Sequence, residues 1–435
     1  MPLQKKAIEH SLSQNNKSWK SMSIRKEITD VFTPRRSEVN DAMYVDRPQL
    51  QKALLRSFAR NSHTLVYGES GNGKSWLYKK VLETNSIPYI VANCANASRI
   101  KSITQEICSC IVEPGTITKM GFNEEKAAEV SAMFAKGGLK HNANYSISQE
   151  EPLLKAFRIF CASTPLKKII VLDNLETIFN SQDLMSELAD IIILLDDSRY
   201  ADCNINFLIV GIPNGVLQYF RETKNSDSVA NRIQEIRRVD NLHSGQVMEI
   251  VRKGFSQLKI SLTGPNLTEI SNHVSEVTLG IAQRVHEYCE SLAYEVSENN
   301  WKYERKLLEK ANQQWLLEGL RHSYQVMEGH LNSRETAVAR RNQVIYCISR
   351  IRLHQFDSSE IDRMVRDEFP STVPNTNMGI GTILGELASG DTPFILRNQK
   401  TAAYVVRDPR YIMCARIILY KDHTDSKVCR RSFTI

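Results

Sequence analysis

Short apolar runs, separated by polar stretches and helical patterns, organise the first half of the chain. The runs at residues 63–67, 88–94, 168–172 and 205–210 are strongly hydrophobic, which is typical of strands buried in a parallel sheet. Residues 103–111 instead carry apolar side chains at helical spacing. This pattern predicts an α/β fold in which a parallel sheet is flanked by helices.

Helical periodicity replaces the apolar runs after residue 242. Residues 242–300 predict several helices, and residues 301–332 predict a long amphipathic helical connector. The remaining elements are predicted as helices at 337–351, 358–369 and 377–388 and strands at 393–396 and 402–406. Three helices followed by a β-hairpin predict a winged-helix domain.

The composition is that of a globular protein with room for more than one domain. The chain has 435 residues, of which 42% are hydrophobic and 24% charged, both ordinary values. No apolar run approaches the roughly 18 residues of a membrane helix, and residues 1–20 lack the apolar core of a signal peptide. We therefore expect a cytoplasmic protein without membrane contact, and a nuclear location stays open. Nine cysteines without paired CxxC motifs predict free thiols.

The chain is mildly basic, with a formal net charge of +7, and part of the excess positive charge lies at the N-terminus. Residues 1–36 contain eight Lys or Arg and three acidic residues, which gives a net charge of +5. A segment of this kind contacts nucleic acid or is a solvated arm. The sequence supports both interpretations equally.

A glycine-rich loop, Gly68-Glu-Ser-Gly-Asn-Gly-Lys74-Ser75, follows the first predicted strand and precedes a predicted helix at 76–83. This order defines a P-loop, whose glycines let several backbone N–H groups point at one phosphate. We expect Lys74 to reach the β- and γ-phosphates of ATP and the Ser75 hydroxyl to ligate Mg²⁺. The predicted nucleotide-binding residues are Gly68, Gly71, Asn72, Gly73, Lys74, Ser75 and Trp76.

A P-loop ATPase needs a second strand that ends in a metal-orienting carboxylate, the Walker B position. The run at 168–172 ends at Asp173, which we expect to act on Mg²⁺ directly or through water. The next residue is Asn174, an amide that cannot accept a proton. Glu176 is the nearest carboxylate. It either serves as the catalytic base or is structural, in which case hydrolysis is slow.

Two further residues are candidates for contact with the γ-phosphate. Asn214 follows the run at 205–210 and suits a sensor at the strand tip, with a turn-forming role as the alternative. Arg232 suits an arginine finger that reaches a neighbouring subunit's nucleotide, although a surface arginine is equally supported. Arg237 and Arg238 lie close to it in the sequence.

In their order along the chain, these motifs resemble those of the initiator-type clade of AAA+ ATPases, the origin-recognition relatives. In that clade a VGR box precedes the P-loop and helps to enclose the adenine; here it reads Val45-Asp46-Arg47, which implies a nucleotide contact for Arg47. The segment from Gly211 to Asn214 is similar to the clade's GISN sensor. The resemblance covers roughly residues 30–290 and extends more loosely to the C-terminus.

The sequence departs from that clade at two positions. Asn174 replaces the usual catalytic glutamate and gives a DNLE pattern that is also seen in signal-transduction (STAND) ATPases. In the lid, Gln283 occupies the place of the expected sensor-2 arginine. Arg284 comes one residue late, which turns it by about 100° on a helix.

The resulting domain prediction has six parts: a basic arm at 1–40, an AAA+ core at 41–241, a helical lid at 242–300, a connector at 301–334, a winged helix at 335–420 and a basic tail at 421–435. Residues 371–390 contain no Lys or Arg, so the predicted recognition helix lacks the usual phosphate contacts. Basic residues lie instead on or after the wing, at Arg397, Lys400, Arg407 and Arg410.

Three functions remain open from the sequence. The first is an ATP-binding switch that forms a homo-oligomer and engages DNA or partner proteins. The second is a STAND-like signalling or anti-phage-defence ATPase that regulates a separate effector protein. The third is an ATP-bound subunit with little turnover. All three use ATP and Mg²⁺ as cofactors.

Overall fold

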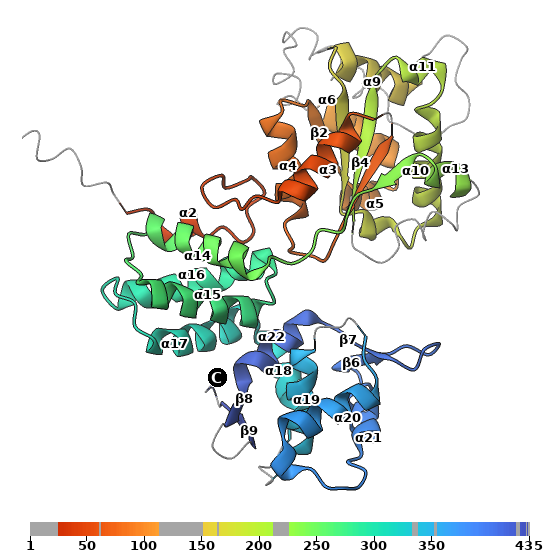
Figure 1. Ribbon diagram of the computed structural model, residues 1–435. Helices are drawn as coiled ribbons and strands as arrows, with labels where there is room; N and C mark the ends of the chain where they lie inside the picture. The colour runs from red at the N-terminus through yellow and green to blue at the C-terminus, as the bar shows by residue number, and fades with distance from the viewer. Residues whose placement is uncertain are drawn as a thin grey trace, which may run out of the picture. The chain divides into compact units, whose positions relative to one another are not determined.

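The protein, shown as a computed structural model, divides into two compact units (Figure 1). The P-loop unit comprises residues 35–242 and 281–283, and the helical unit comprises the other described residues. The structure describes residues 25–60, 62–112, 151–162, 165–211, 226–332, 338–351, 355–422, 427–431 and 433.

The P-loop unit is built on a five-stranded parallel sheet with the order β2-β3-β4-β1-β5. The strands are β1 (His63–Tyr67), β2 (Tyr89–Asn93), β3 (Lys168–Asp173), β4 (Ile205–Gly211) and β5 (Ile233–Glu235). The four strands predicted from apolar runs and the α/β class are confirmed. The three-residue β5 was not predicted, because so short a segment has no distinct pattern. Parallel pairing brings the carboxyl ends of all strands to one edge of the sheet.

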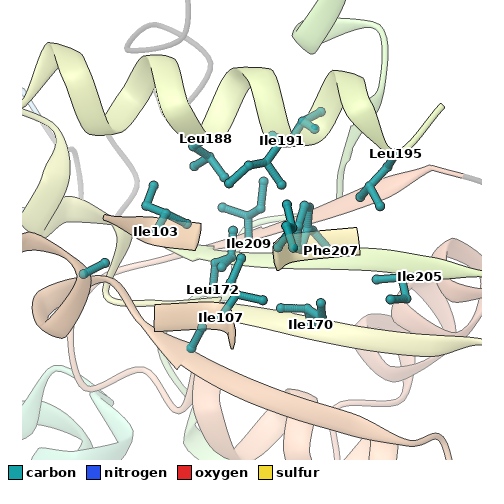
Figure 2. Close-up of a cluster of buried hydrophobic side chains, with 14 of the residues drawn as sticks. Ile103, Ile107, Ile170, Leu172, Leu188, Ile191, Leu195, Ile205, Phe207 and Ile209 are labelled. Carbon is teal, nitrogen blue, oxygen red and sulfur yellow. The ribbon is translucent and has the colours of Figure 1, made fainter. Parts of the chain in front are cut away.

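Side chains alternate between the two faces of the sheet, and helices cover both faces. On one face, Ile170, Leu172, Phe207 and Ile209 join a buried cluster. Figure 2 shows Leu188, Ile191 and Leu195 lying over Phe207 and Ile209. On the other face, Ile169, Val171, Leu208 and Val210 pack in a second cluster. Burial on both faces explains why these strands are continuously apolar.

The covering helices differ between the faces. Helices α3 (Pro48–Phe58) and α4 (Lys74–Thr84) supply the cluster around Val171. Helices α5 (Cys94–Ile100), α6 (Ile103–Val112), α9 (Pro152–Ala162) and α10 (Gln182–Leu194) supply the cluster around Leu172. The smaller elements are η1 (Leu175–Ile178), α11 (Ser198–Ala201) and α13 (Ser226–Ala230).

The helical unit begins with α2 (Ile28–Val31) and continues after residue 242 with α14 (Ser244–Gln257), α15 (Gly264–Thr278) and most of α16 (Ala282–Glu298). Its N-terminal segment contacts residues that lie more than 200 positions later in the chain. The Arg25 Nε donates to the Leu258 carbonyl at 2.8 Å, and its guanidinium lies 3.7 Å from the Trp301 ring centroid. Phe32 is buried against Phe255. The guanidinium of Arg25 is therefore engaged in contacts within the helical unit. Residues 1–24 of the predicted basic arm lie outside the described residues.

The predicted helical connector at 301–332 consists of separate helical segments. The chain forms α17 (Lys306–Gln314), a π-helical turn η2 (Trp315–Gly319) and α18 (Arg321–His330), with a break at Leu320. A Cβ at Gly319 would lie 2.7 Å from the Trp315 ring. The buried indole therefore packs against the glycine backbone where the helix is interrupted.

The C-terminal region has the predicted order of three helices and a hairpin. Helices α19 (Arg340–Arg350), α20 (Ser358–Glu368) and α21 (Ile380–Leu387) precede strands β6 (Ile395–Arg397) and β7 (Tyr404–Val406), which pair antiparallel. A short η3 (Pro370–Thr372) lies between α20 and α21. Helix α22 (Pro409–Ile418) and an antiparallel pair, β8 (Leu419–Asp422) and β9 (Lys427–Arg430), follow. The pair β8–β9 was not predicted. Within the described residues, no helix is long and apolar enough to cross a membrane.

Candidate functional site

The P-loop turns between β1 and α4 at the carboxyl edge of the sheet. Gly71 and Gly73 both have φ of +82°, and Gly73 is the N-cap of α4. Residues with a Cβ rarely adopt this conformation, which explains glycine at both positions. The loop therefore presents the N-terminus of an 11-residue helix at the sheet edge where nucleotides bind in such folds.

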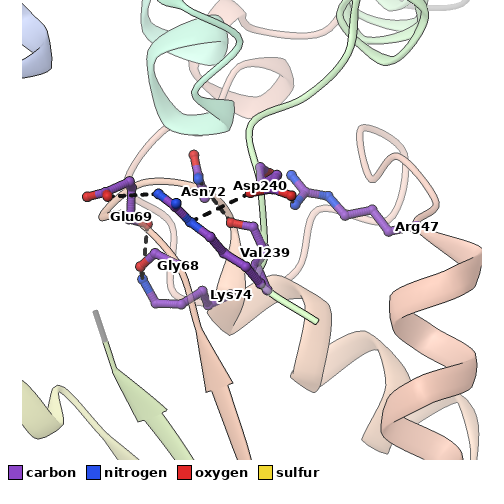
Figure 3. Close-up of polar contacts among 8 residues, drawn as sticks. Arg47, Gly68, Glu69, Asn72, Lys74, Val239 and Asp240 are labelled. Atoms are coloured by element: carbon purple, nitrogen blue, oxygen red, sulfur yellow. Dashed lines mark hydrogen bonds and ion pairs between the residues drawn. The ribbon is translucent and has the colours of Figure 1, made fainter. Parts of the chain in front are cut away.

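Lys74 lies folded back on the loop. Its Nζ donates to the carbonyls of Gly68 at 2.8 Å and Glu69 at 3.0 Å (Figure 3). Burial lowers the pKa of Lys74, and the carboxylates of Glu176, Asp173 and Glu69 oppose that shift. The ammonium is thus partly desolvated and surrounded by negative charge, a setting in which a phosphate group can take the place of the backbone carbonyls.

Asp173 stands at the end of β3, directly beside the P-loop helix. Its Oδ2 accepts from the Ser75 hydroxyl at 3.4 Å and from the Tyr78 hydroxyl at 3.2 Å, and its Oδ1 accepts from the backbone N–H of Asn174 at 2.9 Å. The structure therefore brings together the two predicted metal ligands, Ser75 and Asp173. Tyr78 was not predicted. The only feature of the sequence that could have indicated Tyr78 is its position about one helical turn after Ser75.

Asn174 directly follows Asp173 and adopts a left-handed backbone with φ of 58°. Its side-chain amide donates to Oδ1 of Asn93 at 3.2 Å. Two amides thus lie at the tips of β2 and β3. Glu176 follows on η1, and its charge, with those of Asp173 and Glu69, opposes the lowering of the Lys74 pKa.

The segment after β5 crosses the start of the P-loop (Figure 3). The Val239 N–H donates to the Tyr67 carbonyl at 2.8 Å, and its carbonyl accepts from the buried Asn72 side chain at 3.0 Å. Arg238 forms an ion pair with Glu69 at 2.9 Å. A Cβ at Gly68 would lie 2.4 Å from the Val239 carbonyl oxygen. Gly68 is therefore required by this close approach, a contact that no local motif reveals.

Arg47 and Trp76 flank the loop in different ways. The Arg47 Nη1 donates to the Asp240 carbonyl at 3.0 Å. Its Nη2 lies beside Gly73, where a Cβ on the glycine would be 4.0 Å away. Burial lowers the pKa of Arg47. The Trp76 indole N–H donates to the Arg36 carbonyl at 3.0 Å. Arg47 is thus beside the P-loop, whereas the polar atom of Trp76 is engaged with the chain before it.

The start of α16 also meets the P-loop. The Gln283 N–H donates to the Gly71 carbonyl at 3.0 Å. Gln283 therefore contributes its backbone at the place where an arginine was expected. Arg284 pairs with Glu287 at 2.5 Å within the helical unit.

The remaining predicted residues do not join this constellation. Arg232 precedes β5, and its carbonyl accepts from the His63 N–H at 2.9 Å, at the amino edge of the sheet. Its Nε pairs with Asp196 at 2.6 Å. Arg232 is therefore at the opposite edge from the chain's own P-loop. Asn214 lies outside the described residues.

The residues present fit a nucleotide with a divalent cation. A hydroxyl and a carboxylate, Ser75 and Asp173, are oxygen donors of the kind that Mg²⁺ prefers. Lys74 and the N-terminus of α4 supply positive charge for phosphates. The arrangement can therefore bind a polyphosphate and hold a metal beside it.

Comparison with known proteins agrees with this architecture. Residues 58–220 match the model of a family described as an AAA domain. No curated protein sequence matches the chain. Similar solved structures include a Walker-type ATPase of Pyrococcus abyssi, at 16% identity over 88% of this chain and 99% of that one, with a TM-score of 0.49. Cdc6p of Pyrobaculum aerophilum matches at 14% over 89% and 96%, with a TM-score of 0.42.

A third structure, the Aeropyrum pernix ORC2 protein in ADPNP and ADP complexes, matches at 14% identity over 89% of this chain and 97% of that one, with a TM-score of 0.47. The family match over residues 58–220 and the parallel five-stranded sheet flanked by helices show that this chain contains the AAA+ P-loop fold.

Proposed function

We propose that the protein is an ATP-binding AAA+ switch with slow hydrolysis. The observation that carries this proposal is the convergence of the P-loop and the β3 end, where Ser75 meets Asp173 at 3.4 Å beside the desolvated Lys74. Lys74 exchanges its two carbonyl partners for phosphate oxygens, and the N-terminus of α4 receives the same anion. Ser75 and Asp173 would hold Mg²⁺, which would neutralise phosphate charge there.

Hydrolysis in this proposal depends on Glu176. Asn174 can orient a water molecule but cannot accept its proton, and Glu176, two residues further on η1, is the next carboxylate along the chain. Glu176→Gln is expected to lower the phosphate-release rate by about 100-fold, the lower end for loss of a general base, with ATP affinity kept. Phosphate release under single-turnover conditions measures this.

The matched control is Glu83→Gln, because Glu83 is an exposed carboxylate on α4 that accepts from Tyr89. The control should hydrolyse ATP at the wild-type rate. Equal rates for wild type and Glu176→Gln would refute the role of Glu176 as the catalytic base.

DNA engagement through a winged helix is the second part of the proposal. The helices α19–α21, the hairpin β6–β7 and a bridge between Phe356 and Tyr404 support this fold. Helix α21 contains no basic residue, so the hairpin must supply phosphate contacts. Arg410 is neutralised by Asp408 at 2.6 Å. Arg397 and Lys400 are exposed and form no ion pair among the described residues.

Salt dependence tests this surface. Two phosphate contacts by Arg397 and Lys400 predict that log affinity for duplex DNA falls with log salt with a slope of at least about −1.8 in magnitude. The double variant Arg397→Ala, Lys400→Ala should reduce that slope by about 1.8, and Arg410→Ala should leave it unchanged. A wild-type slope near zero would overturn the DNA proposal.

A STAND-like ATPase that regulates an effector protein is the alternative. Asn174 in place of the glutamate and the neutral helix α21 favour it. For the switch, we propose a homo-oligomer in which Arg232 exchanges Asp196 for the nucleotide of a neighbouring subunit. Electron micrographs with and without ATP distinguish a ring or filament of this chain from a complex that forms only with an effector.

A further inference from the structure

Tyr78 is a fully buried side chain that reaches from the core to the metal-binding end of the sheet. The side chain has no exposed surface, and it packs with Val66, Val171 and Leu208 in the cluster under α4. Its hydroxyl has a hydrogen-bond partner in this apolar setting, because it donates to Oδ2 of Asp173 at 3.2 Å. The side chain therefore connects the rigid core with a carboxylate at the site.

Ser75, the other metal ligand of the proposed site, donates to the same carboxylate oxygen as Tyr78, Oδ2 of Asp173. Ser75 and Tyr78 are three residues apart on α4, a spacing that puts them on one face of the helix. Asp173 comes from β3. The Asp173 carboxylate is thus held by two donors from α4.

Asp173 has little freedom in this arrangement. Its two oxygens accept from three donors: the Ser75 hydroxyl, the Tyr78 hydroxyl and the Asn174 N–H. The Ser75 contact, at 3.4 Å, is the longest of the three. The Tyr78 donor is fixed by core packing, so it is the strongest restraint on the position of Oδ2 from the helix side.

We propose that Tyr78 is a positioning residue for Mg²⁺, which holds the Asp173 carboxylate beside the Ser75 hydroxyl in the geometry that receives the cation. This inference rests on the proposed function, because it assigns Tyr78 a role at that metal site. Hydrogen bonds to metal-ligating carboxylates orient them, and their loss typically lowers metal affinity by 10–100-fold.

The test compares nucleotide affinity with and without metal in Tyr78→Phe. Phenylalanine keeps the ring and nearly the same volume, so the core stays filled. We expect ATP affinity in excess EDTA to equal that of the wild type and the concentration of Mg²⁺ needed for half-maximal tightening to rise about tenfold. A fluorescent ATP analogue titrated with MgCl₂ measures both. An unchanged Mg²⁺ dependence would overturn the positioning role.

Two comparisons keep this result specific. Tyr200→Phe removes a hydroxyl from another buried tyrosine of the same unit, which bonds Glu151 away from the site, and should leave the Mg²⁺ dependence unchanged. In an Asp173→Asn background, Tyr78→Phe should add no further effect on Mg²⁺ dependence; a further tenfold loss there would contradict action through Asp173.

The outcome also separates this inference from the proposed function. If wild-type protein binds no ATP with Mg²⁺, the proposed function fails. If wild-type ATP affinity tightens with Mg²⁺ but Tyr78→Phe behaves like wild type, only the inference about Tyr78 fails. Thermal melting of each variant without nucleotide confirms that the compared proteins are folded.

Discussion

Lys74→Ala is expected to weaken ATP binding by at least about 100-fold. Two charge-assisted hydrogen bonds from one ammonium to phosphate contribute about 1.5–3 kcal/mol each, and each 1.4 kcal/mol is a factor of ten in affinity. Lys74 already has a suitable location, with its Nζ on the carbonyls of Gly68 and Glu69. Isothermal titration calorimetry with ATP and Mg²⁺ measures the change.

The control for this variant is Lys79→Ala on the same helix. Lys79 donates to the Ser37 carbonyl at 2.7 Å and is not at the P-loop. Its replacement removes the same charge from α4 and should change ATP affinity less than threefold. Lys74→Ala with affinity within threefold of the wild type would refute nucleotide binding at this loop.

Gly68→Ala is expected to destabilise the P-loop unit and to abolish nucleotide binding at the P-loop. The added Cβ would lie 2.4 Å from the Val239 carbonyl oxygen, and that carbonyl is held by Asn72 on one side and by the Val239–Tyr67 backbone bond on the other. Because backbone rather than a flexible side chain must move, we expect a loss of about 2–3 kcal/mol in the free energy of unfolding. Urea unfolding followed by circular dichroism measures it.

Gly381→Ala provides the matched comparison for a glycine-to-alanine change. Gly381 lies in α21, and a Cβ there has no heavy atom within 4 Å. Alanine should be neutral or stabilise the protein by up to about 1 kcal/mol, because glycine disfavours helices. If Gly68→Ala were as stable as wild type, the segment at Val239 would not be held against the P-loop as described.

Local sequence patterns were sufficient for the sheet and its P-loop. The apolar runs predicted β1 to β4 because these strands are buried on both faces. The glycines of the loop carry their own conformational signature, φ of +82° at Gly71 and Gly73. Ser75 and Asp173 were predicted separately, from the P-loop and from the end of an apolar strand, and the structure joins them by a hydrogen bond.

Other features depend on contacts between distant segments and have no local pattern. The connector at 301–332 was predicted only as helical, because its apolar spacing does not reveal that the Trp315 ring packs on Gly319 where the helix is interrupted. Arg232 lies at the amino edge of the sheet because it directly precedes β5, which pairs with β1. Strand β5 is too short to predict from the sequence. Its role as a finger and that of Asn214 as a sensor stay predictions.

The sequence by itself therefore determined the parallel α/β core and the P-loop, since each follows from periodicity or from residue types that a loop conformation requires. Only the tertiary structure decided that Tyr78 anchors Asp173, that Val239 excludes any side chain at Gly68 and that Arg238 pairs with Glu69. Those contacts join residues up to about 170 positions apart. Packing brings such residues together, and no spacing within one element can encode that proximity.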